Sequence, residues 1–317
     1  MVDIAQQLSV GLLFPASLDV DAAPLVPKTH LDRLAEFGLY GIEAIDIEPE
    51  ERQLVTEVLA SGCLSTTFVW IQHHRALRWI LDSADPRVRE RWLDLLYSGQ
   101  TKAGLALGGV RPPVPSLIAQ RVSGGWVLDG SVPWVTGWGL IDVLFIGAVA
   151  EGDSQVWAMI DPNSGSGIQA SPLRLVAANS SGTVRLALER HFVPEERVVG
   201  LTGDVPPSEL DNGRGAGSLA LGVARRACNL MGPSRLDEEL EQVRRSLDGA
   251  GEEGMSAARA AASELAVRAS SRLLAHVGSR GILSTSHAQM LVREAAFTSV
   301  FATRPPIRTE LLKLLER

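Results

Sequence analysis

The chain has 317 residues, of which 45% are hydrophobic, so it can bury a large core and is not expected to be disordered. Its formal net charge of −7 argues against a general nucleic-acid-binding protein, because neutralising phosphates requires an excess of lysine and arginine. It has only two cysteines, Cys63 and Cys228, so we expect neither a disulfide framework nor a Cys/His metal site, and a reducing compartment is favoured.

The beginning of the chain, MVDIAQQLSVGLLFP, has an early aspartate and no basic stretch, so it is a poor secretory signal. The longest apolar run, around residues 140–150, contains Asp142 and is too short to span a bilayer. We therefore expect a cytoplasmic protein without a membrane segment and without a nucleic-acid partner.

Residues 1–100 predict helices. In the first of them Leu31, Leu34 and Phe37 recur at a helical spacing, and Gly38 ends it. Further helices are predicted over residues 50–61, over residues 66–81, and from Asp85-Pro86 to Gly99.

The predicted helix 66–81 contains two adjacent histidines, His73 and His74. Adjacent side chains on a helix point about 100° apart, so the two rings cannot act together on one ligand. We therefore interpret the pair as structural or surface residues rather than as a metal or acid-base site.

From Thr101 the pattern changes, because glycines and prolines interrupt any helix and short strands follow to about residue 199. Trp126 to Leu128 is typical of a strand, and Asp129-Gly130 is a pair that favours a tight hairpin turn. Strands are also predicted over residues 143–149, 155–160 and 183–192. Several short antiparallel strands at this spacing predict a small β-barrel.

Helices return at about Gly215, and the apolar periodicity predicts them over residues 219–231, 236–247, 255–277, 286–301 and 307–315. The predicted fold class is therefore α+β and multidomain. We expect an N-terminal helical domain over residues 1–100, a middle antiparallel β-barrel over residues 101–213, and a C-terminal helical bundle over residues 214–317.

One stretch resembles a known family: residues 124–150, GGWVLDGSVPWVTGWGLIDVLFIGAVA. A strand, a turn, Trp-Val-Thr-Gly, an aspartate and a buried strand are similar to the middle domain of the acyl-CoA dehydrogenase family. The resemblance implies that Trp134, Val135 and Thr136 line FAD, which the family buries between barrel and C-terminal bundle, usually in a dimer or tetramer. Taken alone, the tripeptide is more often ordinary strand core with a β-forming threonine, and the flanking order of elements is what favours the flavin site.

The sequence departs from the family in two cofactor segments. The family's Ala-Leu-Thr-Glu-Pro and Gly-Ser-Asp are replaced by residues 106–115, ALGGVRPPVP, so only the backbone N–H groups of Leu107, Gly108 and Gly109 are expected to reach the flavin. The family's Arg and Gln-Phe-Gly, which meet the cofactor's pyrophosphate or adenosine, are replaced by residues 232–236. Arg235 is interpreted as an exposed charge at the start of a helix, with a substitute phosphate contact as the alternative.

The third departure concerns the catalytic base. Counting from Arg293-Glu294, which resembles the family's Arg-Asp, the family's glutamate position falls at Ala302. The other position used in the family falls near Asn212 or Gly213, and the nearest carboxylate is Asp211, a residue type that in a glycine-rich loop is usually a turn former or helix cap. No catalytic residue and no metal ligand is therefore assigned from the sequence.

The resemblance implies a flavin-dependent oxidoreductase that acts on the CH–CH group of an acyl thioester such as acyl-CoA, as a homodimer or homotetramer. A member that works as a flavin monooxygenase, which dispenses with the glutamate base, is one alternative. The other is a degenerate homologue that acts as a partner or structural subunit, since fold does not carry function with it. The sequence does not identify the acyl chain, the electron acceptor or the oligomer count.

Overall fold

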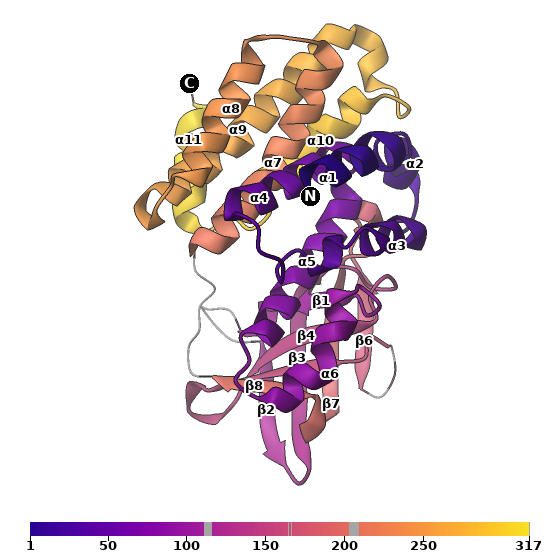
Figure 1. Ribbon diagram of the computed structural model, residues 1–317, viewed down its shortest axis with the longest axis vertical. Helices are drawn as coiled ribbons and strands as arrows, with labels where there is room; N and C mark the ends of the chain where they lie inside the picture. Colours follow the sequence, from indigo (N-terminus) through magenta and orange to yellow (C-terminus); the bar gives the residue numbers. More distant parts are fainter. Residues whose placement is uncertain (111–115, 164, 166, 203–208, 317) are drawn as a thin grey trace.

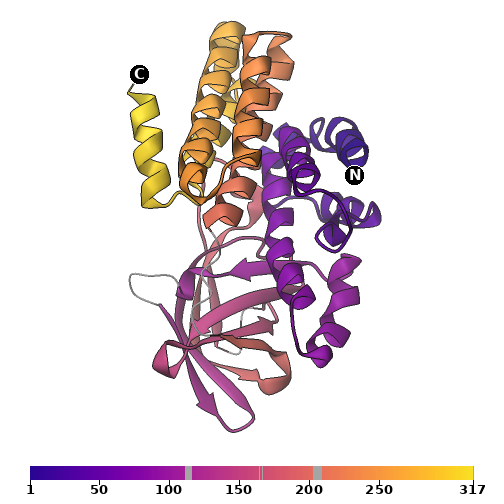
Figure 2. The ribbon, with the colours of Figure 1, turned by 60° about the vertical axis from the view of Figure 1, so that its left-hand side comes forward.

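The computed structural model describes residues 1–110, 116–163, 165, 167–202 and 209–316 (Figure 1). Its elements follow one another as a block of helices, a block of strands and a second block of helices. Figure 2 shows the C-terminal helices standing at one end of the molecule and the sheet at the other, with α5 running alongside the sheet. The change of element type falls between α6 and β1 and again between β8 and α7. The division into three domains at residues 100 and 213 stays a prediction.

The N-terminal block contains α1 (Val2–Leu8), α2 (Ser17–Ala22), α3 (Lys28–Glu36), α4 (Pro49–Gly62), α5 (Leu64–Leu81) and α6 (Pro86–Tyr97). The predicted stop after α3 is confirmed, because Gly38 has a positive φ of 73° that ends the helix. The predicted start of α6 is also confirmed: the Asp85 carboxylate accepts a hydrogen bond from the backbone N–H of Arg87 at 2.9 Å, and Pro86 occupies the first turn.

The middle block contains β1 (Ala103–Ala106), β2 (Leu117–Val122), β3 (Gly125–Val135), β4 (Val143–Val149), β5 (Gln155–Ile160), β6 (Ile168–Pro172), β7 (Val184–Pro194) and β8 (Val198–Thr202). They form one sheet in the order β6-β7-β3-β2-β4-β5-β8, with β1 beside β4. Two pairings are parallel, β1 with β4 and β2 with β4, so the sheet is mixed rather than purely antiparallel. Among the described pairings β6 and β8 are not joined to each other, so the sheet is open where a closed barrel was expected.

The predicted hairpin turn at Asp129-Gly130 is wrong. Strand β3 runs straight through this pair, and the turn between β2 and β3 lies at residues 123–124. The pair instead forms an irregularity in the pairing of β3 with β7. Gly130 has φ 131°, and a Cβ there would lie 2.1 Å from the carbonyl oxygen of Ser116. The positive φ that suggested a turn therefore serves a bulge and a close backbone approach.

The C-terminal block contains α7 (Glu209–Met231), α8 (Arg235–Asp248), α9 (Glu252–Val277), α10 (His287–Val300) and α11 (Pro305–Leu315). Helix α7 packs against α9, α10 and the N-terminal helix α4. It crosses α4 at Gly222, where a Cβ would lie 2.5 Å from the Cβ of Ala60, so only glycine permits this approach. Arg235 is exposed in the first turn of α8, as expected. Within the described residues, none of the helices combines the length and hydropathy needed to cross a bilayer.

His73 connects three elements in the interior. Its Nδ1 accepts a hydrogen bond from the backbone N–H of Ala103 at 3.0 Å, and its Nε2 lies 3.0 Å from the carbonyl oxygen of Leu96. Because Nδ1 accepts a hydrogen bond, the ring is neutral with its hydrogen on Nε2, which donates to the Leu96 carbonyl oxygen. The structural role predicted for the histidines is confirmed, although His73 is buried rather than on the surface. No cluster of three potential metal ligands exists in the part of the chain that the structure describes.

The two histidines predict acid sensitivity. Burial lowers the pKa of His73 well below its usual value of 6.5, and burial together with Arg78 and Arg52 lowers the pKa of His74 to about 3. Above pH 6.5 each ring is neutral in both states, so neither affects stability. As the pH falls below 6.5, the unfolded chain binds protons that the folded chain does not, and folding is progressively destabilised.

His74→Leu tests this pH dependence, because both ring nitrogens of His74 are buried and have no hydrogen-bond partner among the described residues. We expect the loss of unfolding free energy between pH 8 and pH 5, measured by urea denaturation, to be about 2 kcal/mol smaller in the variant. Equal losses in the two proteins would show that His74 does not contribute.

Candidate functional site

Trp134 stands out in the sheet because it is strained and exposed. The pairing of β3 with β7 shifts register between Val132 and Val135, and within this shift Trp134 has φ 59°. Positive φ is uncommon for a residue with a side chain and costs of order 1 kcal/mol or more. Val132 and Val135 are buried, whereas the Trp134 side chain is 65% exposed. A large apolar ring is thus held at the surface by a strained backbone, a combination that is typical of a binding site.

The two residues after Trp134 point into the protein. Val135 is fully buried in the core of the sheet and can offer a ligand only its backbone. The Thr136 hydroxyl is buried and lies 3.1 Å from the hydroxyl of Thr183, which in turn lies 2.8 Å from the hydroxyl of Ser181. Each hydroxyl has one hydrogen and two lone pairs, so Thr136 retains unused hydrogen-bonding capacity.

The segment Leu107 to Gly109 lies beside Pro133, the residue before Trp134, while its expected contact with a flavin stays a prediction. A bridge pairs Leu105 with Thr136, and a Cβ on Gly108 would lie 2.9 Å from the ring of Pro133. A Cβ on Gly109 would lie 2.6 Å from the Cβ of Leu117. These two glycines are therefore required by the protein's own packing, whether or not a ligand also approaches them. Residues 111–115, the rest of the segment that differs from the family, lie outside the described residues.

Helix α5 connects this segment with the end of α10. A Cβ on Gly137 would lie 3.7 Å from Cγ1 of Val69, and the ring of the preceding residue, Phe68, packs edge-on against Phe301 with centroids 4.8 Å apart. Ala302, the family's glutamate position, follows Phe301 and has φ 52°. Adjacent residues of α5 therefore contact both the Thr136–Gly137 turn and the residue that precedes the missing base.

The other expected base position lies near Asn212 or Gly213, and at Gly213 the side chain of Met255 occupies the space. Gly213 lies in α7, and a Cβ there would lie 2.4 Å from Cγ of Met255. The backbone of Asp211 belongs to the first turn of α7, but its side chain lies outside the described part of the structure. Asp211 thus stays a prediction, and a side chain at Gly213 would have to displace Met255.

A loop that the sequence analysis did not single out completes the site. The Arg293 guanidinium donates to Asp21 at 2.5 and 3.1 Å and to the carbonyl oxygen of Val176 at 2.6 Å, so it connects α10 and α2 to the loop at residues 176–183. Glu294 beside it is buried, and burial, followed by the charge of Asp21, raises its pKa to about 8 against the lowering effect of Arg293. The only signal for this loop in the sequence is the short polar run Asn-Ser-Ser-Gly-Thr between two strands.

Comparison with known proteins was made by sequence and by structure. No family model matches the chain. The mitochondrial short-chain specific acyl-CoA dehydrogenase of Rattus norvegicus is 24% identical over 236 residues, 67% of this chain and 56% of the rat protein. The mitochondrial isovaleryl-CoA dehydrogenase of Solanum tuberosum is 31% identical over 125 residues, 36% of this chain and 30% of that protein. The chain thus matches little more than half the length of the rat protein and less than a third of the potato protein.

Solved structures match almost the whole chain. Butyryl-CoA dehydrogenase from Megasphaera elsdenii superimposes with a TM-score of 0.83 at 16% identity, over 100% of this chain and 97% of that one. A glutaryl-coenzyme A dehydrogenase in complex with glutaryl-CoA gives 0.84 at 17% identity, over 99% and 93%. PigA with FAD and proline gives 0.81 at 15% identity, over 99% and 96%.

The helix, sheet and helix arrangement defines the acyl-CoA dehydrogenase fold. The chain therefore has the fold of the acyl-CoA dehydrogenases, and over about two thirds of its length its sequence is similar to theirs.

Proposed function

We propose that the protein binds FAD and is an oxidoreductase of acyl-CoA dehydrogenase type, acting on the CH–CH group of an acyl thioester such as acyl-CoA. The observation that supports this proposal best is Trp134, whose exposed indole is held at positive φ two residues before the buried Thr136 hydroxyl. These are the positions at which the family's Trp-Val-Thr lines its flavin. A bound flavin would supply the hydride acceptor that amino-acid side chains cannot provide.

The residues present fit a flavin at this position. The Trp134 indole offers an apolar face for a planar ring, and the Thr136 hydroxyl has hydrogen-bonding capacity beyond its contact with Thr183. The family resemblance further supports a homodimer or homotetramer. Because Cys63 and Cys228 are both free thiols in the core, we also propose a cytoplasmic location.

A second candidate function follows from the base positions. Ala302 carries no acid, and Gly213 is packed against Met255, so neither family position provides a carboxylate. Without a base the α,β-dehydrogenation would lose on the order of 10² to 10⁴ in rate. A flavin monooxygenase, or a subunit without catalysis of its own, would not need this carboxylate.

The first experiment is incubation of the purified protein with FAD. We expect a yellow protein with flavin absorbance and near-stoichiometric release on denaturation. Bleaching by acyl-CoA without oxygen would support the dehydrogenase, whereas a need for an external reductant would support the monooxygenase. A protein that stays colourless in excess FAD would contradict both.

Trp134→Ala should weaken FAD binding at least about tenfold in Kd, because it removes the apolar ring while leaving the fold unchanged. The side chain is largely exposed, so the free energy of unfolding without flavin should change by no more than about 0.5 kcal/mol. Phe192→Ala is the matched control, an exposed aromatic on β7 of the same sheet, and should leave the Kd unchanged. Equal affinity in the Trp134 variant and the unaltered protein would show that the flavin binds elsewhere.

A further inference from the structure

Three buried hydroxyls form a chain behind the candidate site. The Ser181 hydroxyl lies 2.8 Å from that of Thr183, which lies 3.1 Å from that of Thr136. We infer that Thr183 and Ser181 are positioning residues that set the direction of the Thr136 hydroxyl toward a flavin ring nitrogen. This inference rests on the proposed function and goes beyond it by assigning a role to two residues outside the Trp-Val-Thr segment.

The number of hydroxyl hydrogens determines which hydrogen bonds the three hydroxyls can donate. If Ser181 donates to Thr183, then Thr183 donates to Thr136, and the hydrogen of Thr136 is free to donate outward. If the direction is reversed, Thr136 donates inward and offers only lone pairs outward. A flavin ring nitrogen accepts a hydrogen bond when the flavin is oxidised and donates one when it carries a hydrogen. Because the three hydroxyls can donate outward or inward, Thr136 could bind such a nitrogen in both states.

The loop that carries Ser181 is held in place from three sides. The carbonyl oxygen of Ser181 accepts a hydrogen bond from the backbone N–H of Gly137, the residue after Thr136, at 2.9 Å. The carbonyl oxygen of Ser180 accepts from the N–H of Val26 at 2.8 Å, and Arg293 binds the start of the loop. Because the backbone is fixed, the hydroxyls have few alternatives, and removal of one should not be compensated by movement of the others.

Ser180 provides an internal comparison. It is adjacent to Ser181 and equally buried, but its hydroxyl has no hydrogen-bond partner among the described residues. The two serines share the same burial and the same loop, and they differ in whether they reach Thr183. An effect specific to Ser181 therefore reports on the hydroxyl chain rather than on packing.

The test measures FAD affinity and the visible flavin spectrum of the full chain in six proteins: unaltered, Thr136→Val, Thr183→Val, Thr183→Ser, Ser181→Ala and Ser180→Ala. We expect Thr183→Val to raise the Kd for FAD about tenfold and to shift the flavin absorbance bands, and Thr183→Ser, which keeps the hydroxyl, to restore both. Ser181→Ala should show a smaller change in the same direction. Ser180→Ala should match the unaltered protein.

A double variant separates positioning from general stability. If Thr183 acts through Thr136, then Thr136→Val with Thr183→Val should bind FAD within about twofold of Thr136→Val alone. Additive losses, or a Thr183→Val protein whose melting temperature falls while Kd and spectrum stay unchanged, would overturn the inference. If the unaltered protein takes up no FAD, the proposed function fails as well; if it binds FAD and only the Thr183 effects are absent, this inference alone fails.

Discussion

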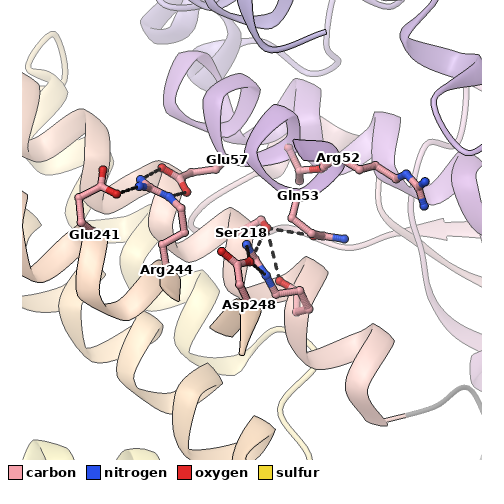
Figure 3. A network of polar contacts seen from close by, with 9 residues as sticks. Arg52, Gln53, Glu57, Ser218, Glu241, Arg244 and Asp248 are labelled. Atoms are coloured by element: carbon pink, nitrogen blue, oxygen red, sulfur yellow. Dashed lines mark hydrogen bonds and ion pairs between the residues drawn. The ribbon is translucent and has the colours of Figure 1, made fainter. Parts of the chain in front are cut away.

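Replacing Glu57 by alanine is expected to lower the free energy of unfolding by about 3 to 5 kcal/mol, because two guanidinium groups would lose their buried counterion. Glu57 lies on α4, and its side chain has no exposed area. Arg244 of α8 donates to both of its oxygens, at 2.6 and 2.7 Å (Figure 3). Arg225 of α7 donates to the same carboxylate at 3.3 Å.

This carboxylate joins the first and last helical blocks of the chain. Beside it, the Ser218 hydroxyl donates to Gln53 of α4 at 3.0 Å (Figure 3). The same hydroxyl accepts a hydrogen bond from Arg214, which also binds Asp248. Although burial disfavours the charge of Arg244, its bonds to Glu57 raise the pKa of its guanidinium above the usual value. The charges are therefore retained, and among the described residues removing Glu57 leaves Arg225 with only the amide of Gln6 and Arg244 with only the exposed carboxylate of Glu241.

Urea denaturation of Glu57→Ala and of a control, Glu310→Ala, measures the effect. Glu310 pairs with Lys313 on the exposed side of α11, where an ion pair contributes about 0.5 kcal/mol or less. Glu57→Gln keeps the volume of the side chain but not its charge. Its loss of unfolding free energy should lie between those of Glu57→Ala and Glu310→Ala. A loss below about 1 kcal/mol for Glu57→Ala would show that the two arginines find other partners or solvent.

The helices could be predicted from local patterns. The helix expected over residues 66–81 is α5, Leu64–Leu81, and the one expected over residues 255–277 is α9, Glu252–Val277. Both have sustained apolar periodicity and clear stop signals, which depend only on neighbours in the sequence. The order of the strands and the parallel pairing of β1 with β4 could not be predicted, because they depend on contacts between distant segments.

Part of the candidate site could likewise be predicted from local sequence, and part could not. Trp134 and Thr136 were found because they stand two residues apart in a segment with a family counterpart. The positive φ of Trp134 was not expected, since tryptophan gives no sign of left-handed backbone. The partner of Thr136 is 47 residues away in Thr183, and a threonine in a strand is usually only a β-forming residue. Hydroxyl contacts of this kind are visible only once the loop is placed.

Replacing Ala302 by glutamate is expected to raise the rate of flavin reduction by acyl-CoA on the order of 10² to 10⁴, if only the base is missing. Ala302 already has φ 52°, so another residue with a Cβ adds little backbone strain. It follows Phe301, whose ring packs against Phe68 of α5, beside the residue that contacts the Thr136–Gly137 turn. A carboxylate here would start from a segment already connected with the proposed flavin wall.

Anaerobic stopped-flow reduction of the FAD-loaded protein measures this gain, and Ala302→Gln is the control because it matches glutamate in size but cannot take a proton. The rate with glutamate should increase as the pH rises through the pKa of the new carboxyl, whereas the glutamine variant should remain at the level of the unaltered protein. If both variants bind FAD and react equally slowly, the missing carboxylate is not what limits the reaction. The chain would then have diverged in substrate binding as well, which would favour the monooxygenase or the noncatalytic subunit.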